Sequence, residues 1–182
     1  FIEDGADGNL LIIICDACTD GTQEYVEELL NNQPGTIQIL KTDFHRDGLA
    51  RNAGLDAATG DWILFLDDDD WFLHERCFEL LAEHVGKRNE DVFMFSFVIT
   101  DTRYFRQTPE EYFTGSCGHC WRLDFIGKER FADMPYGSDT DFTLRMIDRK
   151  PAIALWDMPM YRYNYLREGS LSWVQAHGGD HH

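Results

Sequence analysis

Short apolar runs alternate with segments of helical spacing through the first hundred residues, and this alternation limits the fold more than any other feature. The strand-like runs cover residues 10–14, 37–40, 62–66 and 92–99. Two of them, LLIII at 10–14 and WILFL at 62–66, are apolar at every position, which is typical of strands covered by helices on both faces of a parallel sheet. The sequence therefore predicts an α/β fold with an open, mostly parallel sheet flanked by helices.

Caps and apolar spacing place the helices. A cap at Thr19 or Asp20 would begin the first helix, and the Asn, Pro and Gly residues within 31–35 would end it. The small and apolar residues of 48–59 predict a second helix, with Gly60 as its C-terminal cap. Further helices are predicted at residues 74–85 and 139–147, a final β region at 152–165, and loops with short strands at 101–138.

The length of 182 residues and the composition are those of one folded domain. Hydrophobic residues make up 43% of the chain, and no tract is dominated by Pro, Gly or Ser, which excludes a low-complexity protein. The longest apolar runs, 10–15 and 62–66, are far shorter than the roughly 18 to 20 residues that a membrane-spanning helix needs. No transmembrane segment is predicted.

The charge limits the partners. Sixteen basic residues stand against 33 acidic ones, so the formal net charge is -17. Such a charge repels nucleic acid and anionic lipid, and we therefore expect no nucleic-acid partner. A small anionic substrate would need a local cation, either a few placed arginines or a bound divalent metal.

Two of the predicted strands end in aspartates. Asp16 follows the run 10–14, and four consecutive aspartates, at 67–70, follow the run 62–66. Ligands of open α/β sheets bind beyond the carboxyl ends of the strands, which is where these side chains would lie. The two strand ends are therefore the first candidates for a binding site.

The tetrad at 67–70 favours a hard divalent cation. If strand geometry continued, Asp67 and Asp69 would point to one side and Asp68 and Asp70 to the other. Each close pair of carboxylates repels by about 1 kcal/mol in water, and Mg²⁺ or Mn²⁺ would relieve that repulsion while binding carboxylate and phosphate oxygens. The alternative is an ordinary solvated acidic turn.

Three segments in order carry a resemblance to the family 2 glycosyltransferases. Residues 15–22 read CDACTDGT, similar to the family's Asp-Asp-Gly-Ser-Thr-Asp-Gly-Thr segment. Residues 48–55 read GLARNAGL and residues 58–70 read ATGDWILFLDDDD, which together resemble the family's next block almost position by position. SDTD at 138–141 and the segment 163–172 extend the resemblance over most of the chain.

The resemblance implies a GT-A type fold that transfers a sugar from a nucleotide-diphosphate donor, commonly UDP, with Mn²⁺ or Mg²⁺ and often with inversion. Asp16 would then bind the donor base, and Arg51 would lie near the nucleotide. Asp67 and Asp68 would bind the nucleotide, and Asp69, together with Asp67, would bind the metal. A diphosphate that departs with growing negative charge is stabilised by such a cation.

The resemblance also places a general base and a phosphate-binding arginine. An acceptor hydroxyl must lose its proton as it attacks, and Asp139 matches the family's catalytic aspartate. Its alternative role is that of a helix cap. Arg167 lies in a segment that resembles a loop closing over the donor phosphates, and its alternative is a plain surface arginine.

The resemblance further implies a single GT-A domain at residues 1–173, followed by a tail at 174–182. Residues 1–100 would bind the nucleotide sugar, and residues 101–173 would form the acceptor side. The acceptor would be a glycan or a lipid-linked glycan, as in polysaccharide biosynthesis. An odd number of cysteines without a signal segment predicts a cytoplasmic location, and peripheral association with the inner face of the membrane stays open.

Departures from the family pattern leave other functions open. Cys15 replaces an Asp, Ala17 and Cys18 replace Gly-Ser, and Ser138 replaces the Glu before the catalytic Asp. The family's first strand has no counterpart, so we expect a domain truncated at its N-terminus. A catalytically impaired domain that binds a nucleotide sugar or glycan is therefore one alternative.

The two Cys-x-x-C pairs give a further alternative. They begin at Cys15 and Cys117, and such pairs build zinc sites or redox centres. No thioredoxin-like βαβ pattern surrounds the second pair, and nearly a hundred residues separate the two pairs, so structural thiols are the competing interpretation.

Overall fold

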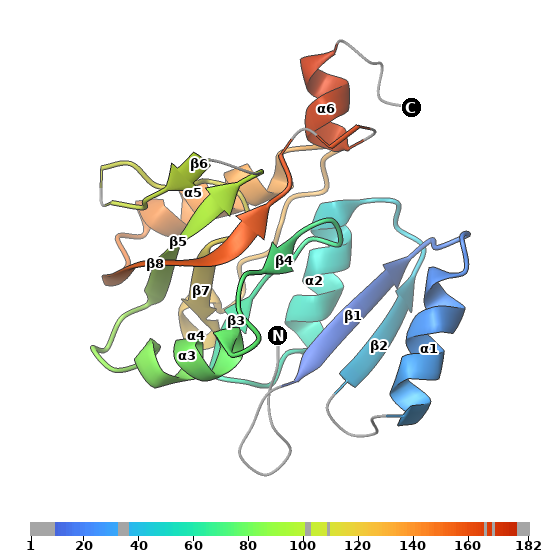
Figure 1. Cartoon of the computed structure of the whole chain (residues 1–182), viewed down its shortest axis with the longest axis horizontal. Helices are drawn as coiled ribbons and strands as arrows, with labels where there is room; N and C mark the ends of the chain where they lie inside the picture. The colour runs from blue at the N-terminus through green and yellow to red at the C-terminus, as the bar shows by residue number, and fades with distance from the viewer. Residues whose placement is uncertain are drawn as a thin grey trace.

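A computed structural model of the chain describes residues 10–32, 37–100, 103–108, 110–165, 167–168 and 170–177. Strands and helices alternate through the first half of the chain as the sequence predicts (Figure 1). The elements of this half are β1 (Leu11–Asp16), α1 (Thr22–Asn32), β2 (Ile37–Thr42), α2 (Asp47–Ala57), β3 (Trp62–Leu64), β4 (Trp71–Phe72), α3 (Cys77–His84) and β5 (Val92–Ile99). Those of the second half are β6 (Arg103–Phe105), β7 (His119–Arg122), α4 (Leu123–Ile126), α5 (Ser138–Asp148), β8 (Ile153–Tyr163) and α6 (Leu171–Ala176).

The strands form two sheets. β1 and β2 pair in parallel, in a register that runs from Leu11 opposite Ile37 to Asp16 opposite Thr42. The other six strands form a sheet of order β3-β7-β5-β8-β4, with β6 paired to β5. Only the β5–β8 pairing of this larger sheet is parallel, and its other pairings are antiparallel.

The expectation of a mostly parallel sheet is therefore wrong in detail, although the α/β class is right. The antiparallel partners β6 and β7 come from residues 101–138, where the sequence has no clear period. Antiparallel neighbours need no crossover helix, so they leave no helical signal between strands. The alternation of strands and helices in the sequence therefore cannot reveal that the strands run in both directions.

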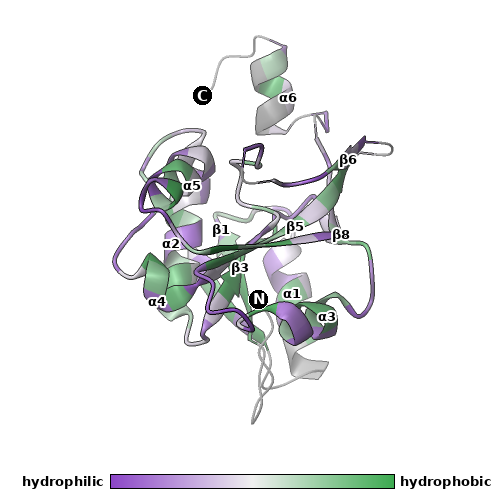
Figure 2. Cartoon of the chain, turned by 90° about the vertical axis from the view of Figure 1, so that its left-hand side faces the viewer, coloured by the Kyte–Doolittle hydropathy of each residue, from purple (hydrophilic) through white to green (hydrophobic). Residues whose placement is uncertain are grey.

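β5 is the central strand and supplies both faces of the core. Phe93, Phe95 and Phe97 belong to one buried cluster, while Val92 and Met94 belong to the other. Successive side chains of a strand point to opposite faces, so an apolar run is required when both faces are covered. Figure 2 shows the strands between α3 on one side and α4 and α5 on the other.

Several boundaries differ from the predicted ones. β3 ends at Leu64 rather than at residue 66, and α3 begins at Cys77 rather than at residue 74. The C-terminal cap of α2 is Ala58 in an extended conformation, so the cap predicted at Gly60 is wrong. The short helix α4 was not expected, because it lies in the aperiodic region.

β1 is less buried than its apolar sequence predicts. Only Cys15, at 3% exposure, is buried among its six residues, and the others are half-buried. β1 pairs with β2 alone among the described residues, so its second edge carries no strand there. The isoleucines of β1 consequently keep part of their surface accessible.

The last helix of the described residues, α6, stands apart from the sheets in Figure 1. α6 covers Leu171–Ala176 and so crosses the predicted boundary between domain and tail at 173–174. Residues 178–182 of the predicted tail lie outside the described residues. In the described part of the chain, no helix has both the length and the apolar character needed to cross a membrane.

Helix α2 packs very closely against the start of α5. A Cβ atom added at Gly48 would lie 2.9 Å from the carbonyl oxygen of Ala132 and equally close to the Cβ and Oγ atoms of Ser138. The Asn52 side chain donates to the Phe131 carbonyl at 2.9 Å and accepts from the Phe131 N–H at 2.8 Å. α2 is therefore fixed both to α5 and to the segment that leads into it.

This packing predicts opposite effects for two glycine substitutions on α2. Gly48→Ala should destabilise the fold by about 1 to 3 kcal/mol, because the new methyl group meets backbone and a buried serine. Gly54→Ala, whose Cβ would lie 3.6 Å from Ile14 Cδ1, should be neutral or stabilise the helix by up to about 1 kcal/mol. Urea unfolding of both variants measures the difference, and equal stabilities would contradict the packing described.

Candidate active site

The four aspartates after β3 form a tight turn instead of extending the strand. The Asp70 N–H donates to the Asp67 carbonyl at 3.2 Å. Asp68 is exposed, whereas Asp70 is only 8% exposed. The prediction that Asp68 and Asp70 share one side is therefore wrong, because side-chain alternation holds only in an extended strand.

Arg51 is the centre of the site. Its Nη1 donates to Asp47 at 2.5 Å and its Nη2 donates to Asp67 at 2.8 Å, while its side chain is only 15% exposed. Burial lowers the pKa of Arg51, but the two carboxylates outweigh burial and raise that pKa above its ordinary value. The hydroxyl of Ser116 lies 3.5 Å from both Asp67 oxygens.

Asp139 lies in the first turn of α5, close to this ionic cluster. Its Oδ1 accepts from the Thr140 N–H at 2.8 Å. Burial raises the pKa of Asp139, as do the charges of Asp67 and Asp47, against the lowering effect of Arg51. A half-buried carboxylate with a raised pKa is a suitable general base.

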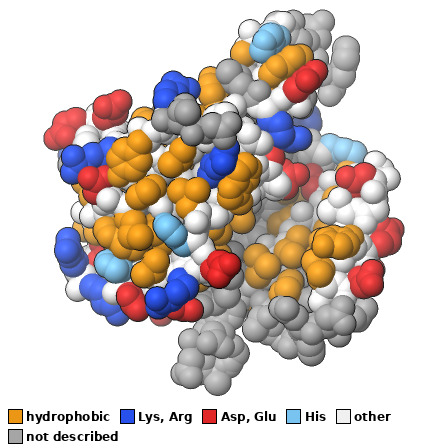
Figure 3. Space-filling view, viewed as in Figure 1, with side chains coloured by type: hydrophobic (Ala, Val, Ile, Leu, Met, Phe, Trp, Pro, Cys, Tyr) orange, Lys and Arg blue, Asp and Glu red, His pale blue; other side chains and the backbone are white. Residues whose placement is uncertain are grey.

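Asp69 and Arg167 meet across almost a hundred residues of sequence. Arg167 Nε donates to Asp69 Oδ2 at 2.9 Å. Figure 3 shows acidic and basic side chains together below α6, near the edge where β8 ends. The structure thus brings Asp67, Asp69, Asp139 and both predicted arginines, Arg51 and Arg167, to the carboxyl ends of the strands.

Asp70 anchors the turn to the end of β8. Its carboxylate accepts from the Tyr161 hydroxyl and, at 2.7 Å, from the Asn164 N–H. Burial raises the pKa of Asp70 to about 6, with help from Asp67 and Asp69 and against these two hydrogen bonds. Asp70 therefore holds the segment that leads to Arg167 beside the turn.

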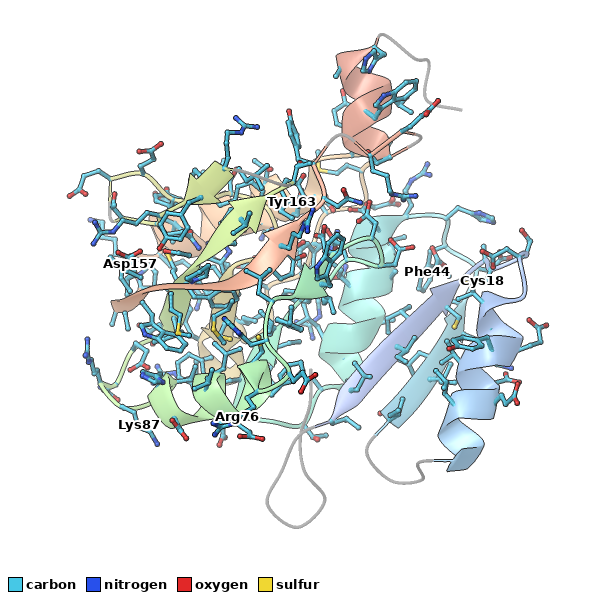
Figure 4. All side chains as sticks on the ribbon, viewed as in Figure 1. Cys18, Phe44, Arg76, Lys87, Asp157 and Tyr163 are labelled. Atoms are coloured by element: carbon cyan, nitrogen blue, oxygen red, sulfur yellow. The ribbon has the colours of Figure 1, made fainter. Side chains whose placement is uncertain are left out.

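Asp16 lies at the end of β1 and contacts a different segment. Its oxygens accept from Thr42 Oγ1 at 2.9 Å, from the Phe44 N–H at 2.7 Å and from the Arg46 N–H at 3.1 Å. Burial raises the pKa of Asp16, but these hydrogen bonds outweigh it and keep that pKa below its ordinary value. Figure 4 shows Phe44 and Cys18 beside this end of β1, so Asp16 shapes the loop that leads into α2.

A comparison with protein families decides what kind of chain this is. The model described as Glycosyl transferase family 2 matches residues 7–156. The chain belongs to glycosyl transferase family 2. The resemblance found in the motifs at 15–22, 48–55 and 58–70 is thereby confirmed.

Two relatives match shorter stretches of this family 2 chain. An uncharacterized glycosyltransferase of Haemophilus influenzae is 39% identical over 75 residues, which are 40% of this chain and 24% of that protein. The poly(ribitol-phosphate) beta-N-acetylglucosaminyltransferase TarS of Staphylococcus aureus is 27% identical over 84 residues, 46% of this chain and 14% of that protein. The matched stretches therefore span 24% or less of either relative.

Solved structures confirm the predicted GT-A type α/β fold. A structure of residues 1–349 of S. aureus TarS in complex with UDP-GlcNAc has a TM-score of 0.75 at 18% identity, covering 90% of this chain and 51% of that one. The mannosyltransferase PcManGT from Pyrobaculum calidifontis, in complex with GDP-Man and Mn²⁺, has a TM-score of 0.69 at 11% identity, covering 90% and 50% of the two chains.

The family makes a divalent cation the expected cofactor, and the carboxylates can be tested against it. In the described residues, no three His, Cys, Asp or Glu side chains stand close enough to hold a metal ion by themselves. Mg²⁺ commonly takes one or two protein carboxylates and completes its shell with water and substrate phosphates. The carboxylate oxygens of Asp67 and Asp69 are of the chemical kind that such an ion binds, and a diphosphate would supply further oxygen ligands.

The thiol alternative does not fit the buried pair. Cys117 and Cys120 are 2% and 5% exposed. Burial raises the pKa of Cys117 well above its ordinary value and the pKa of Cys120 to about 12. In the described part of the chain no three His, Cys, Asp or Glu side chains could hold a metal ion, and redox attack requires a thiolate. These two cysteines belong to the buried core of the larger sheet.

The motifs did not point to three residues that contact the site. Asp47, Ser116 and Tyr161 bind Arg51, Asp67 and Asp70 respectively. The only signal for Asp47 is its spacing of four residues from Arg51, which allows a helical ion pair. Ser116 and Tyr161 lie outside the segments that resemble the family, so only their tertiary contacts identify them.

The raised pKa of Asp70 predicts how stability depends on pH. A carboxyl group with a folded pKa of about 6, above its ordinary value of 3.8, stabilises the fold most when protonated. Between about pH 4 and 6 this contribution, on the order of 2 to 3 kcal/mol, should be lost as the pH rises.

Asp70→Asn is the matched variant for this prediction, because it keeps the shape and cannot ionise. Urea unfolding of both proteins at pH 4, 5, 6 and 7, without metal or nucleotide, gives the two profiles. The wild-type protein should lose stability relative to Asp70→Asn across this range, and parallel profiles would disprove the assignment.

Proposed function

We propose that this chain is the donor-binding and catalytic part of an enzyme that transfers a sugar from a UDP-sugar to an acceptor hydroxyl. One observation carries the proposal: Asp67, from the turn after β3, and Asp139, from α5, lie around the same buried arginine, Arg51. Such a site at the carboxyl ends of strands is where α/β folds bind ligands. The resemblance to the family's motifs assigns the donor to Asp67 and the base to Asp139, which supports the proposal.

The donor side of the proposal rests on charge. A diphosphate approaches a chain with a net charge of -17, so it needs local cations. We assign Asp69 and Asp67 to a shared Mn²⁺ or Mg²⁺, Asp67 and Asp68 to the nucleotide, and Arg167 to the phosphates. When bound, the cation acts as a Lewis acid that stabilises the departing diphosphate.

UDP is the proposed nucleotide. TarS, which matches this chain in sequence and in fold, binds UDP-GlcNAc, whereas PcManGT binds GDP-Man. Asp16 is the proposed contact for the base and Arg51 the proposed residue beside the nucleotide. Both Asp16 oxygens already accept hydrogen bonds from residues 42–46, so the base would bind to a carboxylate of fixed orientation.

The acceptor side of the proposal rests on Asp139. As the acceptor hydroxyl attacks the anomeric carbon, Asp139 takes its proton, which fits a single displacement with inversion. The acceptor class that we propose is a glycan or a lipid-linked glycan. The proposed location is the cytoplasm, a reducing compartment that suits free thiols.

A binding domain without turnover is the second candidate, and Ser138 favours it. Ser138 stands where the family resemblance places a glutamate, so the carboxylate before Asp139 is missing. Binding and turnover must therefore be measured separately.

The donor site is tested by thermal shift with UDP, GDP and Mn²⁺. UDP together with Mn²⁺ should raise the melting temperature by several degrees, because a ligand at about 100 times its Kd stabilises by about 2.7 kcal/mol. Asp69→Ala should abolish the shift, while Asp148→Ala, which removes an exposed carboxylate at the end of α5, should keep it. A shift that survives Asp69→Ala would refute the proposed metal site.

The base is tested by two substitutions in the first turn of α5. Asp139→Asn should lower the release of UDP from UDP-sugars by about 100-fold or more, with UDP binding intact, because a general base contributes about 10² to 10⁴ in rate. Asp141→Asn removes a neighbouring carboxylate that pairs with Arg145, and it should retain activity within about threefold. If Asp139→Asn is as active as Asp141→Asn, the assignment of Asp139 as the base is refuted. A wild-type protein that binds UDP but releases none from UDP-sugars would favour the binding domain without turnover.

A further inference from the structure

Asp47 joins two helices that carry the proposed site. It is the first residue of α2, and its Oδ2 accepts from Arg51 Nη1 at 2.5 Å and from Ser138 Oγ at 3.1 Å. Ser138 is fully buried and directly precedes Asp139. One carboxylate oxygen therefore links the arginine that holds Asp67 to the turn that holds Asp139.

The contact differs from a common surface ion pair between residues four apart on a helix. Exposed pairs of that kind contribute about 0.3 to 0.5 kcal/mol and tolerate many geometries. Here the Arg51 side chain is 15% exposed and the Asp47 side chain 29% exposed. A buried guanidinium that loses one of two carboxylates is costly, so the pair limits where Arg51 can lie.

The planar guanidinium of Arg51 in turn restricts where Asp67 can lie. Nη1 is held by Asp47, and the rigid fork of the guanidinium then sets the direction of Nη2, which donates to Asp67. An aspartate in the first turn of a helix is itself favoured by the helix dipole. Asp47 thus holds Arg51 from a stable position, and Arg51 holds Asp67.

The close packing of α2 against α5 likewise restricts where Asp139 can lie. Gly48 leaves no room for a Cβ atom against Ser138, so α2 and α5 touch at this point. The hydrogen bond from Ser138 to Asp47 fixes the rotamer of Ser138 at the start of α5. The relative position of Asp67 and Asp139 therefore depends on Asp47 from both sides.

We propose that Asp47 is a positioning residue of the transfer reaction, acting through Arg51 on Asp67 and through Ser138 on Asp139. This role rests on the proposed function. Asp47 is not assigned to donor, metal or acceptor. Its negative charge, and not only its shape, is what the role requires.

The test compares two substitutions at position 47 in the intact protein, with Mn²⁺ and UDP-GlcNAc as the donor and release of UDP as the readout. Asp47→Asn keeps the shape and removes the charge, and it should lower kcat/KM by about 10- to 100-fold, the usual range for residues that orient a site. Asp47→Glu keeps the charge on a longer side chain and should retain more activity than Asp47→Asn. Asp56→Asn, on the same helix in an exposed pair with Arg130, should stay within about threefold of wild type.

A double-mutant cycle tests whether Asp47 acts through Arg51. If Asp47 acts through Arg51, then Asp47→Asn should cost much less in the background of Arg51→Lys than alone, because residues in one network are not additive. Additive losses would overturn the proposal, as would Asp47→Asn activity equal to wild type or above that of Asp47→Glu. Should Asp47→Asn not fold, Ser138→Ala decides: a loss of threefold or more supports the role, and unchanged activity overturns it.

The proposed function and this inference fail in different ways. A wild-type protein that neither binds UDP with Mn²⁺ nor releases UDP refutes the proposed function, and the role of Asp47 falls with it. A wild-type protein that is active, with variants at position 47 in the wrong order, refutes only the role of Asp47.

Discussion

The ion pairs of a buried arginine are the interaction on which the rest of the site depends. Arg51 reaches Asp47 on its own helix and Asp67 in the turn after β3. Its charge also opposes the burial that raises the pKa of Asp139 at the start of α5. Three segments far apart in sequence thus share one cation. Because a buried charge without its partners is strongly unfavourable, the cluster forms as a whole.

The scaffold places this cluster through packing. β5 carries apolar side chains to both faces, and α2 meets α5 closely enough that only glycine fits at position 48. Asp16 orients the loop before α2, and Asp70 holds the turn of aspartates against the end of β8. Aspartates that look alike in sequence therefore differ in the contacts that they make in the fold.

The negative net charge of the chain explains why a bound diphosphate would need cations directly beside it. A net charge of -17 opposes a diphosphate at long range, and Arg51 is already bound by two carboxylates. Arg167 pairs with Asp69, so it neutralises a carboxylate at the very place where the proposed metal and phosphates would bind. In an acidic protein an anionic ligand needs a cation close by, and a bound divalent ion can be the largest local charge.

The sequence by itself determined the elements whose side chains have a strong period, and the tertiary structure decided the contacts between them. The boundaries predicted for 92–99 match β5, and those for α2 and α5 differ by one or two residues, because apolar spacing and caps are local properties. The end of β3 at Leu64 could not be predicted, since it depends on β7, which pairs with Leu64 through Cys120 and comes from a region without period. The motifs named Asp67, Asp69 and Asp139. The contacts of Asp47, Ser116 and Tyr161 follow only from the tertiary structure, because hydrogen bonds between distant segments leave no spacing in the sequence.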